Sequence, residues 1–265
     1  MPELPEVESV RRQLAPELAG RRVASVWWDP HPEQRFSDVA LLEGRRVEDV
    51  TRRGKYLVCP LDEDLELVLH LGMTGSFSFG PPDPYARARF GLDDGRELVF
   101  RDPRRFGRVS VVEAGDYAAI PTLAALGPEP LSDDFDVDAF AAALRRSNAP
   151  VKAALLGQRL VAGVGNIYAD EALWRTRIHP TSRRVGRDRA RVLHAAIREV
   201  LTEAIEREGT TFRDYQMVNG ESGRNAPFLS AYGQEGMPCP RCGTAMRKTV
   251  VAQRGTTYCP RCQRP

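Results

Sequence analysis

The sequence has no long apolar run, few cysteines and very few lysines. No apolar stretch approaches the ~20 residues that a membrane-spanning helix needs, and no apolar signal segment lies behind the charged N-terminus. We therefore expect a soluble, cytoplasmic protein whose five cysteines are thiols and not disulfides. No redox cofactor or nucleotide site is apparent, so these classes of function are not expected.

Lysine is nearly absent, because only Lys55, Lys152 and Lys248 stand among the 38 basic residues. Arginine replaces lysine wherever charge alone is needed. We hypothesise that a remaining lysine marks a position that requires an ammonium point charge or a titratable amine, which guanidinium does not provide.

Charge is segregated along the chain although the net charge is only +2. From Gly236 to the end there are six basic residues and no acid, and residues 101–108 hold four arginines against one aspartate. Residues 129–138 instead carry five acids and no base. Basic patches within a nearly neutral total indicate that one face meets a polyanion, although each patch alone fits a solvated surface.

Four of the five cysteines form two C-x2-C pairs, Cys239 with Cys242 and Cys259 with Cys262, separated by sixteen residues. This spacing is typical of a four-cysteine zinc ribbon. Four thiolates leave no open coordination position, so we expect one structural zinc ion and no catalytic metal. Cys59 lies in an apolar run and is expected to be a buried strand residue.

The start of the chain reads Met1-Pro2-Glu3-Leu4-Pro5-Glu6. If Met1 is removed, Pro2 carries a secondary amine, which is partly unprotonated near neutral pH. Such an amine attacks a carbon at the aldehyde oxidation level and gives an iminium cation, with Glu3 placed to shuttle protons. The alternative is that these residues only begin a helix, with prolines in its first turn and acids at its positive end.

The pattern predicts an α+β protein of two domains. A helix over residues 3–19 is followed by short strands between residues 22 and 112, which predict an antiparallel β-sandwich. Helices are expected over residues 137–146, 151–156, 166–176 and 187–208. The expected boundaries are a β domain at 1–114, a linker at 115–136, a helical domain that ends in a long loop at 137–235, and a zinc finger at 236–265.

Three glycine-rich segments carry candidate binding residues. A Gly-x-Gly hairpin at residues 161–165 leads into a helix, which favours an anion such as a DNA phosphate, although an ordinary turn fits equally well. The segments 70–75 and 102–107 place Met73, Arg104 and Phe106 on turns, where they are poor core residues. Side chains of this kind make good wedges for a duplex from which a base has been flipped.

Together these motifs resemble the formamidopyrimidine-DNA glycosylase and endonuclease VIII family of bifunctional base-excision repair enzymes. The resemblance covers essentially the whole chain, with PELPEVE, GKYL, HLGMTG, DPRRFG, VAGVGNIYADE and CPRC…CPRCQ in that order. PELPEV and DPRRFG favour the formamidopyrimidine branch. The resemblance implies a glycosylase and AP lyase that removes 8-oxoguanine and formamidopyrimidines from double-stranded DNA through a Schiff base and β,δ-elimination. It also implies that the β domain at 1–114 is catalytic and that residues 137–235 form a helix–two-turn–helix DNA-binding domain with a lesion loop. We expect a monomer.

The resemblance also implies catalytic roles. Pro2 is the nucleophile on C1′ of the damaged nucleotide, and Glu3 is the acid that assists ring opening and proton transfer. Glu6 shapes the pocket. Lys55 holds the phosphate beside the lesion, and Arg254 clamps phosphates and assists the last elimination.

The implied contacts with DNA come from both domains. They are His70, Met73, Tyr85, Arg104, Phe106, Lys152 and Asn166. Three of these, Met73, Arg104 and Phe106, fill the gap left by the flipped base, with Arg104 facing the orphaned partner.

Two segments depart from the family pattern. Residues Pro84 to Arg87 replace a stretch in which relatives carry histidines, and residues 223–228 lack the Gly-Tyr-Phe of the loop that covers the flipped base. The second departure keeps alive a preference for oxidised pyrimidines. A DNA-binding protein that recognises damage without cutting it is a further alternative, which requires that Met1 stay in place or that Pro2 not reach a sugar.

Overall fold

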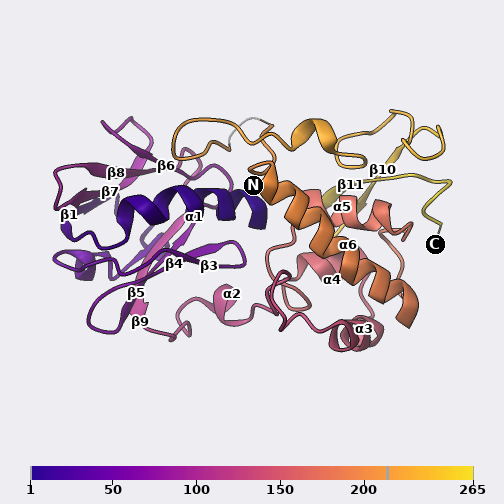
Figure 1. The fold of residues 1–265 in the computed structure, drawn as a ribbon, viewed down its shortest axis with the longest axis horizontal. Helices are drawn as coiled ribbons and strands as arrows, with labels where there is room; N and C mark the ends of the chain where they lie inside the picture. The colour runs from indigo at the N-terminus through magenta and orange to yellow at the C-terminus, as the bar shows by residue number, and fades with distance from the viewer. Residues whose placement is uncertain (1, 213–214, 265) are drawn as a thin grey trace. The chain divides into compact units, whose positions relative to one another are not determined.

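A computed structural model of the protein describes residues 2–212 and 215–264, so Met1 lies outside the described residues (Figure 1). The chain divides into two compact units, Met1–Ala124 with Arg207–Arg224, and Ala125–Glu206 with Asn225–Pro265. The return of residues 207–224 to the first unit differs from the sequence expectation, which placed them with the helices. Among the described residues, no helix combines the length and the apolar character needed to cross a membrane.

The first unit opens with helix α1 (Leu4–Leu18), as predicted. Its N-terminus is a capping box between Glu3 and Glu6, which satisfies backbone N–H groups that the first helical turn leaves unpaired. Val7, Val10 and Leu14 repeat at helical spacing and are buried. The helix therefore docks one apolar face on the core and fixes the position of residues 2 and 3.

Two sheets share one hydrophobic core with α1. The antiparallel four-stranded sheet has the order β1-β7-β8-β6, with strands β1 (Val23–Trp28), β6 (Ser76–Phe79), β7 (Ala86–Leu92) and β8 (Glu97–Arg101). The five-stranded sheet has the order β2-β9-β5-β4-β3, with strands β2 (Phe36–Ser37), β3 (Thr51–Arg53), β4 (Tyr56–Pro60), β5 (Leu65–His70) and β9 (Arg108–Glu113). Within the described part of these two sheets, only the short β2–β9 pairing is parallel. The predicted sandwich is confirmed, and Phe77 and Phe100 of one sheet join Leu57 and Leu69 of the other in its core.

Short helices and a returning segment complete the first unit. The 3-10 helices are η1 (Glu33–Arg35) and η2 (Val39–Leu42), and the helix α2 (Pro121–Ala124) lies within the predicted linker. Ile120 and Leu123 are buried there, so this stretch is packed and not merely a tether. In the returning segment, Tyr215 and Met217 join the same core.

The second unit consists of helices and a terminal hairpin, drawn from pink to yellow in Figure 1. The helices are α3 (Val137–Arg146), α4 (Val151–Leu156), α5 (Asn166–Arg175), α6 (Arg187–Glu206) and the 3-10 helix η3 (Ala226–Phe228). The strands β10 (Arg247–Val251) and β11 (Arg254–Tyr258) pair antiparallel. The four predicted helices are confirmed, and Asp136 caps α3 by accepting the Ala139 N–H at 2.7 Å.

Candidate functional site

The first group of candidate residues lies buried at the start of α1. Pro2, Glu3 and Glu6 are all buried, and the Glu6 carboxylate links two parts of the unit. Its Oε2 accepts the Glu3 N–H and its Oε1 accepts the Thr210 N–H, each at 2.7 Å. A Cβ on Gly209, which has φ of +82°, would lie 2.8 Å from Oε1, so this close approach requires glycine. Glu6 therefore fixes Pro2 and Glu3 against the returning segment.

Lys55 and His70 lie at two neighbouring strands of the five-stranded sheet, Lys55 in the turn before β4 and His70 at the end of β5. Lys55 stands directly before β4, and Tyr56 pairs with His70 in the register of β4 and β5, with ring centroids 4.6 Å apart. Burial, together with the charges of Lys55 and Arg108, lowers the pKa of His70 to about 4. His70 is thus neutral near pH 7, and its Nδ1 accepts the Gly72 N–H at 3.1 Å. The remaining proton is therefore on Nε2, which makes His70 a donor for an anion.

The predicted wedge residues lie on two adjoining turns. Met73 is on the turn between β5 and β6, and Arg104 and Phe106 are on the turn between β8 and β9. Met73 is 37% exposed and Phe106 is 41% exposed, whereas most apolar side chains of this unit are buried. The Arg104 guanidinium lies 5.1 Å from the centre of the Phe106 ring. Tyr85 is exposed as well, and Arg101 covers its ring.

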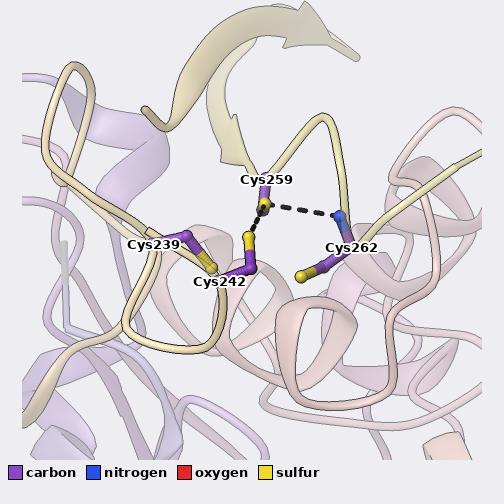
Figure 2. Close-up of side chains that lie close together, drawn as sticks. All are labelled: Cys239, Cys242, Cys259 and Cys262. Atoms are coloured by element: carbon purple, nitrogen blue, oxygen red, sulfur yellow. Dashed lines mark hydrogen bonds between the residues drawn. The ribbon is translucent and has the colours of Figure 1, made fainter. Parts of the chain in front are cut away.

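The four zinc-ribbon cysteines converge (Figure 2). Their Sγ atoms all lie within 4.8 Å of one another, and those of Cys242 and Cys259 are 3.5 Å apart. Zinc–sulfur bonds of about 2.3 Å in a tetrahedron require sulfur–sulfur distances of roughly 3.8 Å. The donor set and its spacing fit one structural zinc ion held by Cys239, Cys242, Cys259 and Cys262, as predicted.

Both cysteine pairs are attached to the helices of their unit. Gln263 accepts the Cys259 N–H at 2.8 Å and donates to the Ile178 carbonyl at 2.9 Å. Arg241 donates to the carbonyls of Trp174 and Arg175 at the end of α5 and lies over the Trp174 ring. The finger is therefore bound to the helices and not suspended from a linker.

Lys152 requires a correction. It is completely buried, and its Nζ lies 2.6 Å from Asp170, 2.8 Å from Thr256 Oγ1 and 3.3 Å from the Gly255 carbonyl. The ammonium is thus enclosed by acceptors and is not presented for the expected contact with DNA. We reassign Lys152 as a residue that positions β11.

Asn166 acts on the same hairpin. Its Nδ2 donates to the Gly255 carbonyl at 3.1 Å, so Asn166 and Lys152 both bind the residue that follows Arg254. Arg254 itself is exposed at the start of β11. The hairpin is therefore held by the buried Lys152 and by Asn166, while the Arg254 side chain is exposed to solvent.

One amide of the Gly-x-Gly hairpin is used inside the fold. The Gly163 N–H donates to Gln158 Oε1 at 2.8 Å, and Gln158 Nε2 donates back to the Val164 carbonyl at 2.5 Å. The Gly163 amide is therefore used within the fold and does not face an anion.

Sequence reasoning missed the residues that hold these groups in place. Asp102 lies within a turn motif of the sequence and Asp170 within a predicted helix, and neither was assigned a role. Asp102 is 1% exposed and accepts hydrogen bonds from both wedge turns. The signal available was the residue type alone, since a distant partner of each, Thr74 for Asp102 and Thr257 for Asp170, lies 28 and 87 residues away.

Acidification is expected to destabilise the first unit through His70. The unfolded chain binds a proton near the ordinary pKa of about 6.5, whereas the folded side chain does so only near about 4. The contribution of neutral His70 to the free energy of unfolding is therefore complete above pH 6.5. It falls by at most about 3 kcal/mol as the pH falls from 6.5 to about 4. His70→Gln should flatten the curve of unfolding free energy against pH, while the exposed control His31→Gln should not; equal slopes in both variants would contradict this.

Loss of one zinc ligand should release the hairpin. Cys242→Ser is expected to lose bound zinc and hydrogen-exchange protection over residues 247–258, because the metal closes both knuckles. Zinc analysis and peptide-level hydrogen exchange provide the measurement. Cys59→Ala, which removes a buried thiol outside the cluster, should retain both properties. Full zinc content in Cys242→Ser would show that this thiol is not a ligand.

Breaking the Lys152–Asp170 pair should loosen the same hairpin without removing zinc. Lys152→Met leaves a buried carboxylate uncompensated, which costs about 3–5 kcal/mol. We expect faster hydrogen exchange over residues 247–258 in Lys152→Met. The double variant Lys152→Met with Asp170→Leu should recover much of the protection, because no buried charge remains. Unchanged exchange in the single variant would disprove the positioning role.

Comparison with known proteins identifies the family. Three sequence profiles match in order, the formamidopyrimidine-DNA glycosylase N-terminal domain over residues 1–109, its H2TH domain over 126–216, and a zinc finger found in FPG and IleRS over 236–265. The formamidopyrimidine-DNA glycosylase of Deinococcus radiodurans is 48% identical over 277 residues, covering 99% of this chain and 97% of the relative.

Solved structures agree with these matches. The MutM (Fpg) protein of Thermus thermophilus superposes with a TM-score of 0.94 at 49% identity, covering 99% of this chain and 98% of that one. The wild-type Lactococcus lactis Fpg in complex with DNA containing N7-benzyl-Fapy-dG superposes with a TM-score of 0.90 at 34% identity, with full coverage of both chains. The chain therefore belongs to the formamidopyrimidine-DNA glycosylase family of enzymes.

Proposed function

We propose that this protein is a bifunctional DNA glycosylase and AP lyase of base excision repair that removes oxidised purines from double-stranded DNA. The observation that carries the proposal is the buried start of the chain, where the Glu6 carboxylate accepts the Glu3 N–H beside the buried Pro2. The family match over the whole chain supports it, as does the N7-benzyl-Fapy-dG-containing DNA in the complex of the Lactococcus lactis relative.

The proposed reaction begins at the Pro2 amine, once Met1 has been removed. The nitrogen forms a bond to C1′ of the flipped nucleotide as the bond from C1′ to the base breaks, and the proton lost by the amine nitrogen goes to the departing base. Glu3 then donates a proton to O4′ as the C1′–O4′ bond of the sugar ring breaks, which leaves the iminium cation. The resulting iminium makes the C2′ proton acidic. Loss of the C2′ proton expels the 3′ phosphate in β-elimination, and δ-elimination then expels the 5′ phosphate.

The remaining residues position DNA in this proposal. Lys55 and the Nε2–H of His70 bind phosphates near the lesion, and Tyr85 and Asn166 contact the duplex. Met73, Arg104 and Phe106 occupy the gap left by the flipped base. Arg254, carried by the zinc-finger hairpin, clamps a phosphate and assists the last elimination.

The units divide this work. The first unit is the catalytic part, and the helices and the zinc finger of the second unit bind DNA. We expect one copy of the chain to act alone, in the cytoplasm and on the nucleoid. Zinc is the one cofactor implied, and its role is architectural.

Oxidised pyrimidines are the second candidate substrate. The observation in their favour is the loop at 223–228, where Arg224 is paired with Glu208 and Phe228 is 59% exposed, so the residues that would cover a flipped base differ from the family pattern. A non-catalytic damage-binding protein is the third alternative, and it predicts binding without strand cleavage.

The test compares a duplex carrying one 8-oxoguanine with a duplex carrying an oxidised pyrimidine, in the presence of borohydride. We expect a reduced covalent adduct and strand cleavage on the purine duplex. Glu3→Gln should bind this duplex yet excise the base about 10²–10⁴-fold more slowly, because a general acid is lost. Glu43→Gln, an exposed control in the same unit, should behave as the wild type.

The outcomes separate the candidates. An adduct on the pyrimidine duplex alone would replace the purine assignment and make residues 223–228 the basis of specificity. Binding without any adduct, from protein whose mass shows that Met1 is removed, would leave only the damage-binding alternative. Full excision by Glu3→Gln would remove its proton role.

A further inference from the structure

The two wedge turns contact each other through their backbones. A Cβ at Gly72, which has φ of +63°, would lie 2.5 Å from the Phe106 carbonyl carbon and 2.6 Å from the Gly107 nitrogen. No side chain fits between the turns at this point. The positions of Met73 and Phe106 are therefore coupled, and whatever fixes one turn fixes the other.

The buried Asp102 carboxylate joins these turns. Its Oδ1 accepts the Thr74 hydroxyl at 2.5 Å, and its Oδ2 accepts the Gly107 N–H at 2.6 Å. The Arg104 N–H also points to Oδ1, at 3.3 Å, and shares this interaction with Thr74 Oγ1. One carboxylate thus receives donors from the turn that carries Met73 and from the turn that carries Arg104 and Phe106.

The second turn holds a backbone conformation that needs such support. Arg105 has φ of +57°, in the left-handed region that residues with a Cβ seldom adopt. Its guanidinium donates to Asp29 Oδ2 and to the His31 carbonyl, each at 2.6 Å. Arg105 is therefore directed away along the sheet, which leaves Arg104 and Phe106 on the exposed side of the turn.

Asp102 is held from the opposite side as well. Its carbonyl accepts the Arg87 Nε–H at 3.0 Å, and its N–H donates to the Tyr85 carbonyl at 3.0 Å. Asp102 is only 1% exposed, so it does not itself reach DNA. It also contributes a charge that favours protonation of His70, against the effect of burial.

We propose that Asp102 is the positioning residue that fixes Met73, Arg104 and Phe106 as one rigid wedge. The inference rests on the proposed function, because it assigns these side chains to the gap left by a flipped base. Flipping an intact lesion requires the wedge, since unstacking must be compensated. An abasic site has no base to extract, so its cleavage depends far less on the wedge.

The principal variant is Asp102→Asn. An amide has one acceptor oxygen and two N–H groups, so it cannot accept from both turns as the carboxylate does. We expect the rate of single-turnover 8-oxoguanine excision to fall by about 10-fold or more, because a displaced wedge slows flipping of the base. Cleavage at an abasic site needs no base flipping, so its rate should stay within about two-fold of the wild type. The exposed control Asp83→Asn, in the loop between β6 and β7, should leave both rates unchanged.

Thr74 provides a second variant that leaves Asp102 intact. Thr74→Val removes the hydroxyl that bridges the turns and keeps the volume, whereas Thr74→Ser keeps the hydroxyl. We expect Thr74→Val to lose 8-oxoguanine excision selectively and Thr74→Ser to retain it. This pair applies even where Asp102→Asn fails to fold, as judged by thermal unfolding and zinc content.

Fluorescence of 2-aminopurine placed opposite the lesion reports on wedge insertion directly. We expect the signal on binding to fall in Asp102→Asn and in Thr74→Val, and Met73→Ala to add little to either, because the three changes impair one unit. Equal loss at lesion and abasic site, or no loss at either, would overturn the proposal. A wild-type protein that cleaves neither substrate would instead refute the proposed function.

Discussion

The buried carboxylate of Glu6 is the interaction on which the proposed chemistry depends. It accepts one backbone N–H from Glu3 and another from Thr210, so it joins the first residues of the chain to a segment about two hundred positions later. A chain terminus is ordinarily the least ordered part of a domain. Here the helix cap and the returning segment remove that freedom, which is what a nucleophile carried by the second residue requires.

Buried carboxylates that accept hydrogen bonds from separate segments recur elsewhere in the structure. Asp102 collects donors from two turns, Asp170 accepts the Thr257 N–H while pairing with Lys152, and Glu171 accepts the N–H groups of residues 230–232 ahead of the finger. A buried carboxylate has several acceptor positions and is costly to leave unpaired, so it holds separate backbone segments firmly. Arginine supplies the exposed positive charge of this chain, whereas buried acids fix the loops that carry it.

Local sequence patterns predicted the elements that depend on local forces. The ranges Val137–Arg146 and Val151–Leu156 and the cysteine spacing each reflect a short stretch of chain, and the structure confirms them. The partners of Arg87 and Arg89 in strand β7, which are the Asp102 carbonyl and Glu97, become visible only in the structure. The sequence also did not predict that Lys152 is buried or that residues 207–224 return to the first unit. Both features depend on contacts between residues that are remote in sequence.

The proposed covalent intermediate forms on the N-terminal proline, and the near absence of lysine makes the modified residue directly measurable. The chain offers only Pro2 and three lysines as amines once Met1 is removed, and Lys152 is enclosed by acceptors. Tandem mass spectrometry of the borohydride-reduced adduct, after cleavage at arginine, should place the deoxyribose remnant on the peptide Pro2–Arg11. A remnant on the peptide that contains Lys55, with Pro2 unmodified, would contradict the assignment of Pro2 as the nucleophile.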